Sequence, residues 1–102
     1  MKDYQKKVDE WVTQHKIGYW KPFEIMTHIT EEVGELAREV SHRFGPKVKK
    51  KSESKAELED EIGDVIFALT CLANSLDLDI EKGMKNTLDK CYGRDNERWE
   101  KK

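Results

Sequence analysis

Two short stretches of the sequence carry the same arrangement of acidic residues. Residues 31–36 read EEVGEL and residues 60–65 read DEIGDV, so the acidic, apolar and glycine positions match throughout. Residues three apart lie on the same side of an α-helix, and we place each acidic pair on one shoulder of its helix's apolar face. If the two helices pack antiparallel, four carboxylates can converge, those of Glu32, Glu35, Glu61 and Asp64.

Such a group of carboxylates points to a bound cation. Negative charges held together raise one another's pKa and destabilise a fold unless a cation neutralises them. All four candidate ligands offer hard oxygen atoms, with no histidine or cysteine among them. This donor set suits Mg²⁺ or, as a substitute, Mn²⁺, and it argues against zinc. We therefore predict a divalent metal site formed by these four residues.

Each acidic stretch also contains a glycine at the same place, Gly34 in the first and Gly63 in the second. A glycine inside a helix costs about 1 kcal/mol relative to alanine, so its presence in both copies indicates a use for the missing side chain. Both glycines fall on the shoulder opposite the carboxylates. We expect the two helices to approach each other closely at these positions.

An acidic helix face is, in its simplest interpretation, a solvated surface paired with lysine and arginine. Such partners are scarce in both acidic helices. Arg38 is the only lysine or arginine between Glu24 and Glu39, and Lys55 is the only one within residues 55–64. Acidic residues that lack internal partners at this density favour an external cation.

The two acidic stretches lie in the two longest predicted helices. Apolar residues recur at intervals of three and four, which is the helical period, over residues 22–43 and residues 54–76. The second of these helices begins with a capping-box pattern, in which Ser54 precedes Glu57 by three residues. A basic loop over residues 44–54 separates the two helices and is long enough for them to pack antiparallel.

Shorter helices are expected at both ends of the chain. One covers about residues 3–15, and another follows Asp79 as its cap and carries Met84 and Leu88 on its apolar side. Asp95 can cap a short final turn. The sequence therefore predicts an all-α, four-helix-bundle-like domain of four to five helices.

The composition limits the other classes of function. The 102 residues suffice for one domain over residues 1–102, and 19 basic against 21 acidic residues leave no global positive charge for nucleic acid or an anionic membrane. Cys71 and Cys91 are too few for a disulfide framework, which favours a reducing cytoplasm. No apolar run approaches the roughly 20 residues that span a bilayer. Since only 36% of residues are apolar, we expect an oligomer that shares core surface.

The acidic residues also occur in the order of a known family. The pattern Glu-Glu-x-x-Glu at residues 31–35, followed by Glu-x-x-Asp at residues 61–64, resembles that of the MazG-type nucleotide pyrophosphohydrolases. The likeness extends over about residues 4–99. It is closest to small single-domain bacterial members, in which TEEVGELAREV, EIGDVIFALTCLANSLD and the terminal RDxxRW have near counterparts.

This resemblance implies an all-α NTP pyrophosphatase fold and an enzyme of nucleotide-pool housekeeping. Such an enzyme hydrolyses a nucleoside or deoxynucleoside triphosphate between its α and β phosphates and releases a nucleoside monophosphate and pyrophosphate. The resemblance also implies a homo-oligomer, either a dimer or a tetramer, in which a partner subunit could complete each site. It assigns Mg²⁺ ligands to Glu32, Glu35, Glu61 and Asp64 and catalytic roles to Glu31, Glu32 and Glu35, with Glu31 a candidate for activating water.

Other residues are candidates for binding the nucleotide. Lys90 and Arg94, four residues apart, could bind the phosphates or simply stabilise a helix C-terminus. Trp20 could stack on a base or pack in the core. His28 could bind substrate or pair with the carboxylate one turn later in its helix. Asn74 is a further candidate for contacting a base.

Two other functions fit parts of the sequence. A di-iron helical bundle gathers carboxylates but needs Glu-x-x-His on two helices, and this chain offers that spacing once, at Glu39 and His42. A non-enzymatic helical module, whose acidic shoulders recruit a basic partner, would show no dependence on metal.

Overall fold

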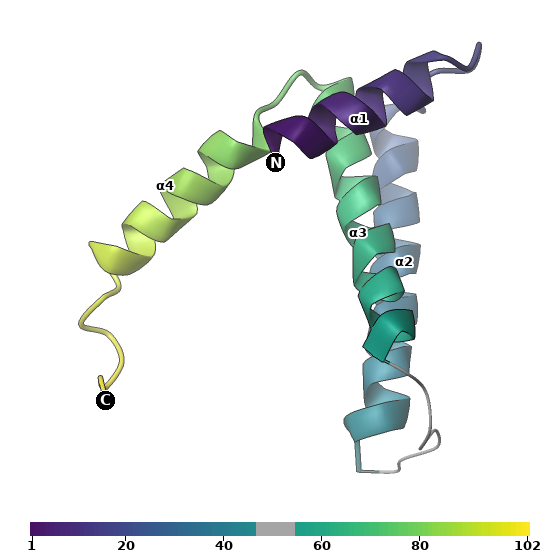
Figure 1. Ribbon diagram of the computed structural model, residues 1–102. Coiled ribbons are helices and arrows are strands. Elements are labelled where there is room, and N and C mark those ends of the chain that lie inside the picture. The colour runs from purple at the N-terminus through teal and green to yellow at the C-terminus, as the bar shows by residue number, and fades with distance from the viewer. Residues whose placement is uncertain (47–54) are drawn as a thin grey trace.

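Four helices account for the regular structure of residues 1–46 and 55–102, the part of the chain that the computed structural model describes. They are α1 (Lys2–Thr13), α2 (Pro22–Phe44), α3 (Lys55–Ser75) and α4 (Ile80–Tyr92), and these residues contain no strand (Figure 1). The predicted all-α fold is confirmed. None of the described helices is both long enough and apolar enough to cross a membrane. The basic loop and the capping residue Ser54 fall mainly on residues 47–54, outside the described part.

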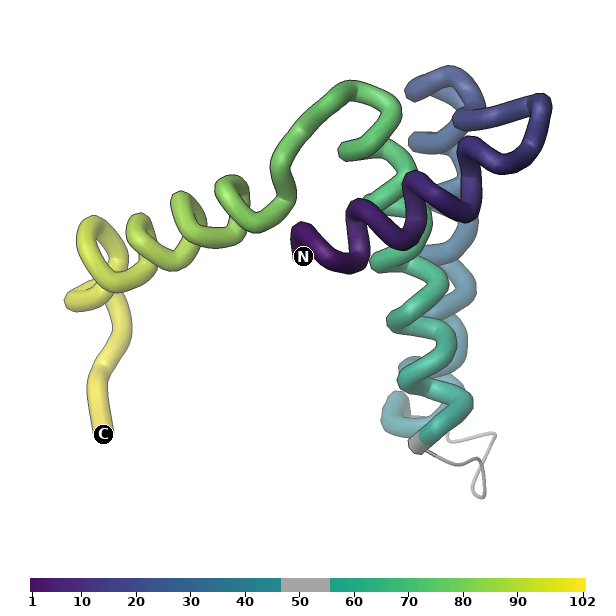
Figure 2. The backbone as a smooth tube through the Cα atoms, turned by 45° about the horizontal axis from the view of Figure 1, so that its top comes forward, coloured from purple at the N-terminus to yellow at the C-terminus, as the bar shows by residue number. Residues whose placement is uncertain are grey.

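The two acidic helices, α2 and α3, lie side by side and run in opposite directions (Figures 1 and 2). α2 begins with Pro22, whose fixed φ suits the first turn of a helix. Ile25 and Ile29 of α2 are buried against Ala68 of α3, and the half-buried Cys71 extends this core. The antiparallel pairing places the middle of α2 opposite the first half of α3, which carry the two acidic stretches.

α1 crosses α3 near the end of the α2–α3 pair, as Figure 2 shows. Its Val12 is buried, and the ring of Trp11 meets the ring of Phe67 edge to face, with 6.0 Å between centroids. The chain turns back toward α2 through Gly18, whose φ of +61° is readily adopted by glycine. The loop of residues 14–21 is thereby held beside both α2 and α3.

α4 packs along no other helix of the described residues and extends away from the α2–α3 pair (Figure 1). The carboxylate of Asp79 accepts a hydrogen bond from the Lys82 N–H at 3.3 Å, which confirms the predicted cap. Met84 and Leu88 are 51% and 50% exposed, although the sequence places them on an apolar side. The four helices therefore do not close into a bundle within one chain.

Residues 93–97, which include the predicted capping residue Asp95, adopt turns and do not form a fifth helix. Asp95 accepts a hydrogen bond from Arg94 Nε at 3.1 Å, and the same carboxylate oxygen lies 3.7 Å from Arg98 Nη1. Guanidinium groups thus take the oxygen that a helix cap would use. Four helices, rather than five, are present in the described residues.

Gly34 and Gly63 do not mark a close contact between helices, and that prediction is wrong for the single chain. Both glycines are exposed, and a β-carbon added at either would have no atom of the described residues within 4 Å. The physical reason is the position of the packing seam. Large side chains such as Ile25 and Ile29 form the contact between α2 and α3, and the glycines face away from it.

A second set of apolar side chains on the α2–α3 pair remains between 42% and 47% exposed. On each helix they repeat every seven residues, the spacing with which helices pack along one another in coiled coils and bundles. A single chain leaves this surface uncovered. We call it the heptad surface, and it comprises Met26, Val33 and Val40 of α2, Ile62 and Leu69 of α3, and Leu76 directly after α3.

Candidate active site

Three of the four predicted metal ligands converge between α2 and α3. One carboxylate oxygen from each of Glu32, Glu61 and Asp64 lies within 4.8 Å of the others. Glu32 and Glu61 are half-buried, whereas Asp64 is exposed. The antiparallel pairing brings the second acidic residue of each stretch, Glu32 and Glu61, to the same place, as the sequence pattern predicts. We call these three residues the acidic cluster.

The acidic cluster contains two oxygens that the described residues leave unsatisfied. Glu32 Oε2 and Glu61 Oε2 are both buried, and neither has a hydrogen-bond donor within the described residues. A buried polar atom without a partner costs roughly 1–3 kcal/mol, and more when it is charged. Two such oxygens beside a third carboxylate form a donor set that fits a hard divalent cation.

The electrostatics of Glu61 agree with this interpretation. Burial raises the pKa of its carboxyl group, and the negative charge of Asp64 raises it further, followed by those of Glu35, Glu39 and Glu32. A nearby cation acts in the opposite direction, because it favours the ionised carboxylate. The geometry therefore collects the negative charge of several carboxylates at one point between α2 and α3.

Glu35 and Glu31 are the two predicted catalytic carboxylates that lie outside the acidic cluster. Both are exposed on α2. Glu35 is near enough for its charge to raise the pKa of Glu61, but its oxygens do not join the group of three. The roles of Glu35 as a ligand and of Glu31 in activating water stay predictions.

Glu39 and Arg43 are neighbours of the cluster that sequence reasoning did not assign to the site. Glu39 lies two turns after Glu32 on α2, and its charge also raises the pKa of Glu61. Its Oε2 is 3.8 Å from Arg43 Nε, and the side chains of Glu39 and Arg43 are only 15% and 8% exposed. The interval of seven residues from Glu32 to Glu39 was the signal available in the sequence.

His28 connects the acidic cluster to the aromatic residues of the loop before α2. Its Nε2 lies 3.5 Å from Glu32 Oε1, as one of the two sequence interpretations expected. On its other side, the imidazole ring meets the ring of Trp20 edge to face, with 5.6 Å between centroids. A group bound beside Trp20 would therefore lie one side chain away from the acidic cluster.

A pocket of about 370 Å³ opens where α1, the loop of residues 14–21, α2 and α3 meet. Trp20 and His28, both predicted to bind substrate, line it. Trp11, Phe67 and Cys71 also line it, and sequence reasoning did not assign them because their contacts depend on how α1 crosses α3. The complete lining consists of Trp11, Val12, His15, Ile17, Gly18, Tyr19, Trp20, Ile25, His28, Phe67, Ala68 and Cys71.

The predicted phosphate-binding cations lie elsewhere in the single chain. Lys90 is on α4, and Arg94 follows that helix and is held by Asp95. Neither residue lines the pocket or belongs to the acidic cluster. Lys90 makes no ion pair with any described residue. One chain therefore does not bring these cations to the carboxylates.

The chain matches the model of the MazG nucleotide pyrophosphohydrolase domain over residues 21–99. This segment contains both acidic stretches and all of α2 and α4. The chain belongs to the MazG nucleotide pyrophosphohydrolase family. The resemblance of the acidic motifs is thus confirmed.

Relatives of this MazG-type chain agree in sequence and in structure. It is 50% identical over 102 residues to the uncharacterized protein YpjD of Bacillus subtilis, with 100% of this chain and 92% of YpjD covered. The crystal structure of B. subtilis YpjD, a candidate pyrophosphatase, matches with a TM-score of 0.82 over 87% of this chain and 91% of that one. The Bacillus-conserved MazG protein, a nucleotide pyrophosphohydrolase, matches at 43% identity with a TM-score of 0.77, over 87% and 85% of the two chains.

Membership of the MazG family makes the protein an enzyme, a hydrolase of the nucleotide pyrophosphohydrolase class. This decides against the non-enzymatic module and against a di-iron redox protein. The aromatic pocket lies at the end of the α2–α3 pair that α1 crosses, the acidic cluster lies further along the pair, and His28 lines the pocket and contacts Glu32 of the cluster. They form one continuous candidate active site.

Proposed function

We propose that this MazG-type enzyme hydrolyses a nucleoside or deoxynucleoside triphosphate between its α and β phosphates. The products are a nucleoside monophosphate and pyrophosphate. The observation that carries this proposal is the pair of buried oxygens of Glu32 and Glu61 beside Asp64, which no described residue hydrogen-bonds. We place the reaction in the cytoplasm, in keeping with the free thiols of Cys71 and Cys91.

We assign a Mg²⁺ site, which Mn²⁺ could also fill, to Glu32, Glu35, Glu61 and Asp64. The carboxylate oxygens are the ligands that these hard cations prefer. Bound there, the cation would offset the charge of the phosphates and lower the pKa of an attacking water. Glu35 is exposed one turn after Glu32, and its charge already raises the pKa of Glu61. Glu31 is the proposed carboxylate for orienting that water.

The pocket is the proposed site of the base. A cavity of about 370 Å³ is within the range of roughly 300–1,000 Å³ that small-molecule sites occupy. The faces of Trp20 and Trp11 offer stacking surfaces for a planar ring. His28, between Trp20 and Glu32, lies where the sugar or the first phosphate of a nucleotide would pass from the pocket to the carboxylates.

We propose a homo-oligomer, a dimer or a tetramer, in which a second copy completes the site. Two features support a second copy: the heptad surface is exposed in one chain, and α4 packs along no other described helix. The negative charge of a triphosphate calls for cationic side chains beside the metal site. Lys90 lies on α4, and Arg94 lies just after it. Packing of α4 on a neighbouring chain would bring these cations to the carboxylates of that neighbour.

The activity is tested by incubating the purified protein with each common ribonucleoside and deoxyribonucleoside triphosphate and Mg²⁺. The proposal expects equimolar nucleoside monophosphate and pyrophosphate, and no product when a chelator replaces the metal. Release of orthophosphate alone, or of nothing from any nucleotide, would contradict it. Ranking the nucleotides by kcat/KM then identifies the preferred base and sugar.

A further inference from the structure

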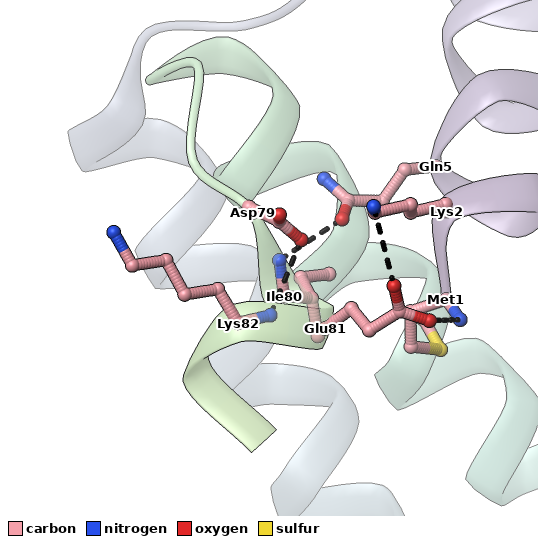
Figure 3. A network of polar contacts seen from close by, with 7 residues as sticks. All are labelled: Met1, Lys2, Gln5, Asp79, Ile80, Glu81 and Lys82. Carbon is pink, nitrogen blue, oxygen red and sulfur yellow. Dashed lines mark hydrogen bonds and ion pairs between the residues drawn. The ribbon is translucent and has the colours of Figure 1, made fainter. Parts of the chain in front are cut away.

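One network of hydrogen bonds ties the wall of the pocket to the start of α4. Gln5 of α1 is at its centre. Its Nε2 donates to Asn74 Oδ1 at 2.9 Å and to the Leu78 carbonyl oxygen at 2.8 Å. Its Oε1 accepts from the Ile80 N–H at 2.9 Å. Figure 3 shows this side chain reaching the first residues of α4, next to the ion pair of Lys2 with Glu81. Every polar atom of the Gln5 amide is used.

Asn74, at the end of α3, extends the network toward the pocket. Its Nδ2 donates to the Gln5 carbonyl oxygen at 2.9 Å and to the Tyr19 hydroxyl oxygen at 3.0 Å. The Tyr19 hydroxyl in turn donates to Asp9 Oδ1 at 2.8 Å. All the hydrogen-bonding groups of the Asn74 amide are therefore occupied within the protein. The earlier suggestion that Asn74 contacts a base does not fit this arrangement.

The network fixes the loop that forms one wall of the pocket. Tyr19 lines the pocket and is followed directly by Trp20, while Asn74 is not among the lining residues. Burial raises the pKa of Tyr19 to about 12, and its hydrogen bond to Asp9 adds to this effect. The hydroxyl therefore stays protonated and continues to donate throughout the neutral range. A loop that turns through the left-handed Gly18 is held in place by these bonds.

We propose that Asn74 and Tyr19 are positioning residues that preform the pocket for the nucleotide base, and that Gln5 couples this pocket to the direction of α4. The inference rests on the proposed function. A preformed wall lowers the ordering cost of binding, because the loop need not be fixed when substrate arrives. The Asn74 side chain acts through Tyr19 and does not touch substrate.

The decisive variants remove hydrogen bonds while conserving shape. Asn74→Leu removes the amide, and Tyr19→Phe removes one oxygen while the ring stays on the pocket wall. For the best nucleotide, each should raise KM about tenfold and leave kcat within about twofold, because binding is lost but the carboxylates are unchanged. The double variant should raise KM little beyond either single variant, since both remove the hydrogen bond between Asn74 and Tyr19. Tyr92→Phe, at a tyrosine 77% exposed at the end of α4, is the matched control and should change neither constant.

Hydrogen exchange of the residue 14–21 segment, followed by mass spectrometry, tests the structural part separately. Exchange there should be faster in Asn74→Leu and Tyr19→Phe than in the wild type and in Tyr92→Phe. Tyr19→Phe also keeps the test valid if Asn74→Leu does not fold. An unchanged KM in Tyr19→Phe, effects that multiply in the double variant, or unchanged exchange would each overturn the proposal. If the wild type releases no pyrophosphate, the proposed function itself fails, and faster exchange would still support the positioning of the loop.

Discussion

α3 and α4 both carry apolar residues at intervals of three and four but have different surroundings. α3 is packed by α2 on one side and by α1 on another, so that its Ala68 is only 1% exposed. α4 has the same three-and-four spacing of apolar residues, yet its Leu88 is 50% exposed. The difference teaches that periodicity identifies the apolar side of a helix but not the surface that will cover it.

The α2–α3 pair and α4 also differ in the charges that they offer to a nucleotide. The α2–α3 pair gathers carboxylates whose buried oxygens lack donors within the described residues. The α4 region carries Lys90 and Arg94, on or after a helix that packs along no other helix of the described residues. A triphosphate with its metal needs both kinds of charge. The comparison therefore suggests that one chain holds the metal half of the site and α4 supplies the phosphate half.

The largest expected effect is on the α2–α3 side. Glu61→Gln should lower kcat/KM by about 100-fold or more, because it replaces a proposed metal ligand. Losing a direct ligand lowers activity more than losing a residue that only orients a ligand. Without metal, the variant should melt no lower than the wild type, because it removes a charge that Asp64 and Glu35 repel. Pyrophosphate release and thermal melting followed by circular dichroism measure the two effects.

The matched control for this variant is Glu10→Gln, at an exposed glutamate of α1 outside the acidic cluster. It should keep the wild-type rate. Rates for Glu61→Gln within a few-fold of the wild type would remove Glu61 from the metal site and break the contrast between the two regions.

Lys90→Ala tests the α4 half, with an expected loss of roughly 10- to 100-fold in kcat/KM from a lost charge-assisted contact to phosphate. Mixing this variant with Glu61→Gln sharpens the test. If α4 acts on a neighbouring chain, mixed oligomers should regain activity. In them, the intact acidic cluster of a Lys90→Ala subunit can meet the intact Lys90 of a Glu61→Gln subunit. Activity that stays at the sum of the two variants after subunit exchange would instead place both halves of the site in one chain.

Trp20→Ala tests whether the pocket beside the α2–α3 pair binds the nucleotide base. The loss of one stacking partner, worth roughly 1–3 kcal/mol, should raise KM about tenfold and change kcat little. The exposed Trp99 offers the control variant Trp99→Ala. Equal effects of the two substitutions on KM would show that the pocket does not hold the base.

The smallest effect is on the pH dependence of stability without metal. Burial, Asp64 and Glu35 raise the pKa of Glu61 above the ordinary value of 4.5. At pH values between 4.5 and this raised pKa, Glu61 holds a proton in the folded protein that it has released in the unfolded chain. The free energy of unfolding should therefore fall as pH rises from about 4.5 through the raised value. Melting temperatures measured in a chelator should show this fall in the wild type and Lys90→Ala but not in Glu61→Gln.

Much of the helical fold could be predicted from the sequence because local patterns specify it. Pro22 marks the start of α2, Asp79 caps α4, and the repeated acidic stretches fall on paired helices. The convergence of Glu32, Glu61 and Asp64 followed from that pairing.

The remaining features depend on contacts that no local pattern encodes. Trp11 reaches the pocket only because α1 crosses α3. Asn74 forms hydrogen bonds with Gln5, which is 69 residues away in the sequence, and with Tyr19, which is 55 residues away. The glycines were misread because helical spacing places Gly34 on a shoulder but does not say whether another helix lies there.

The most direct test of the metal site is a crystal of the protein grown with Mn²⁺ and measured at a wavelength at which manganese scatters anomalously. The account predicts an anomalous peak within bonding distance of carboxylate oxygens of Glu32, Glu61 and Asp64, and no peak there in Glu61→Gln. The central claim is that the metal binds between α2 and α3. It would be contradicted if the wild-type protein is active with Mn²⁺ but its crystals show the metal only elsewhere, or show none between these helices.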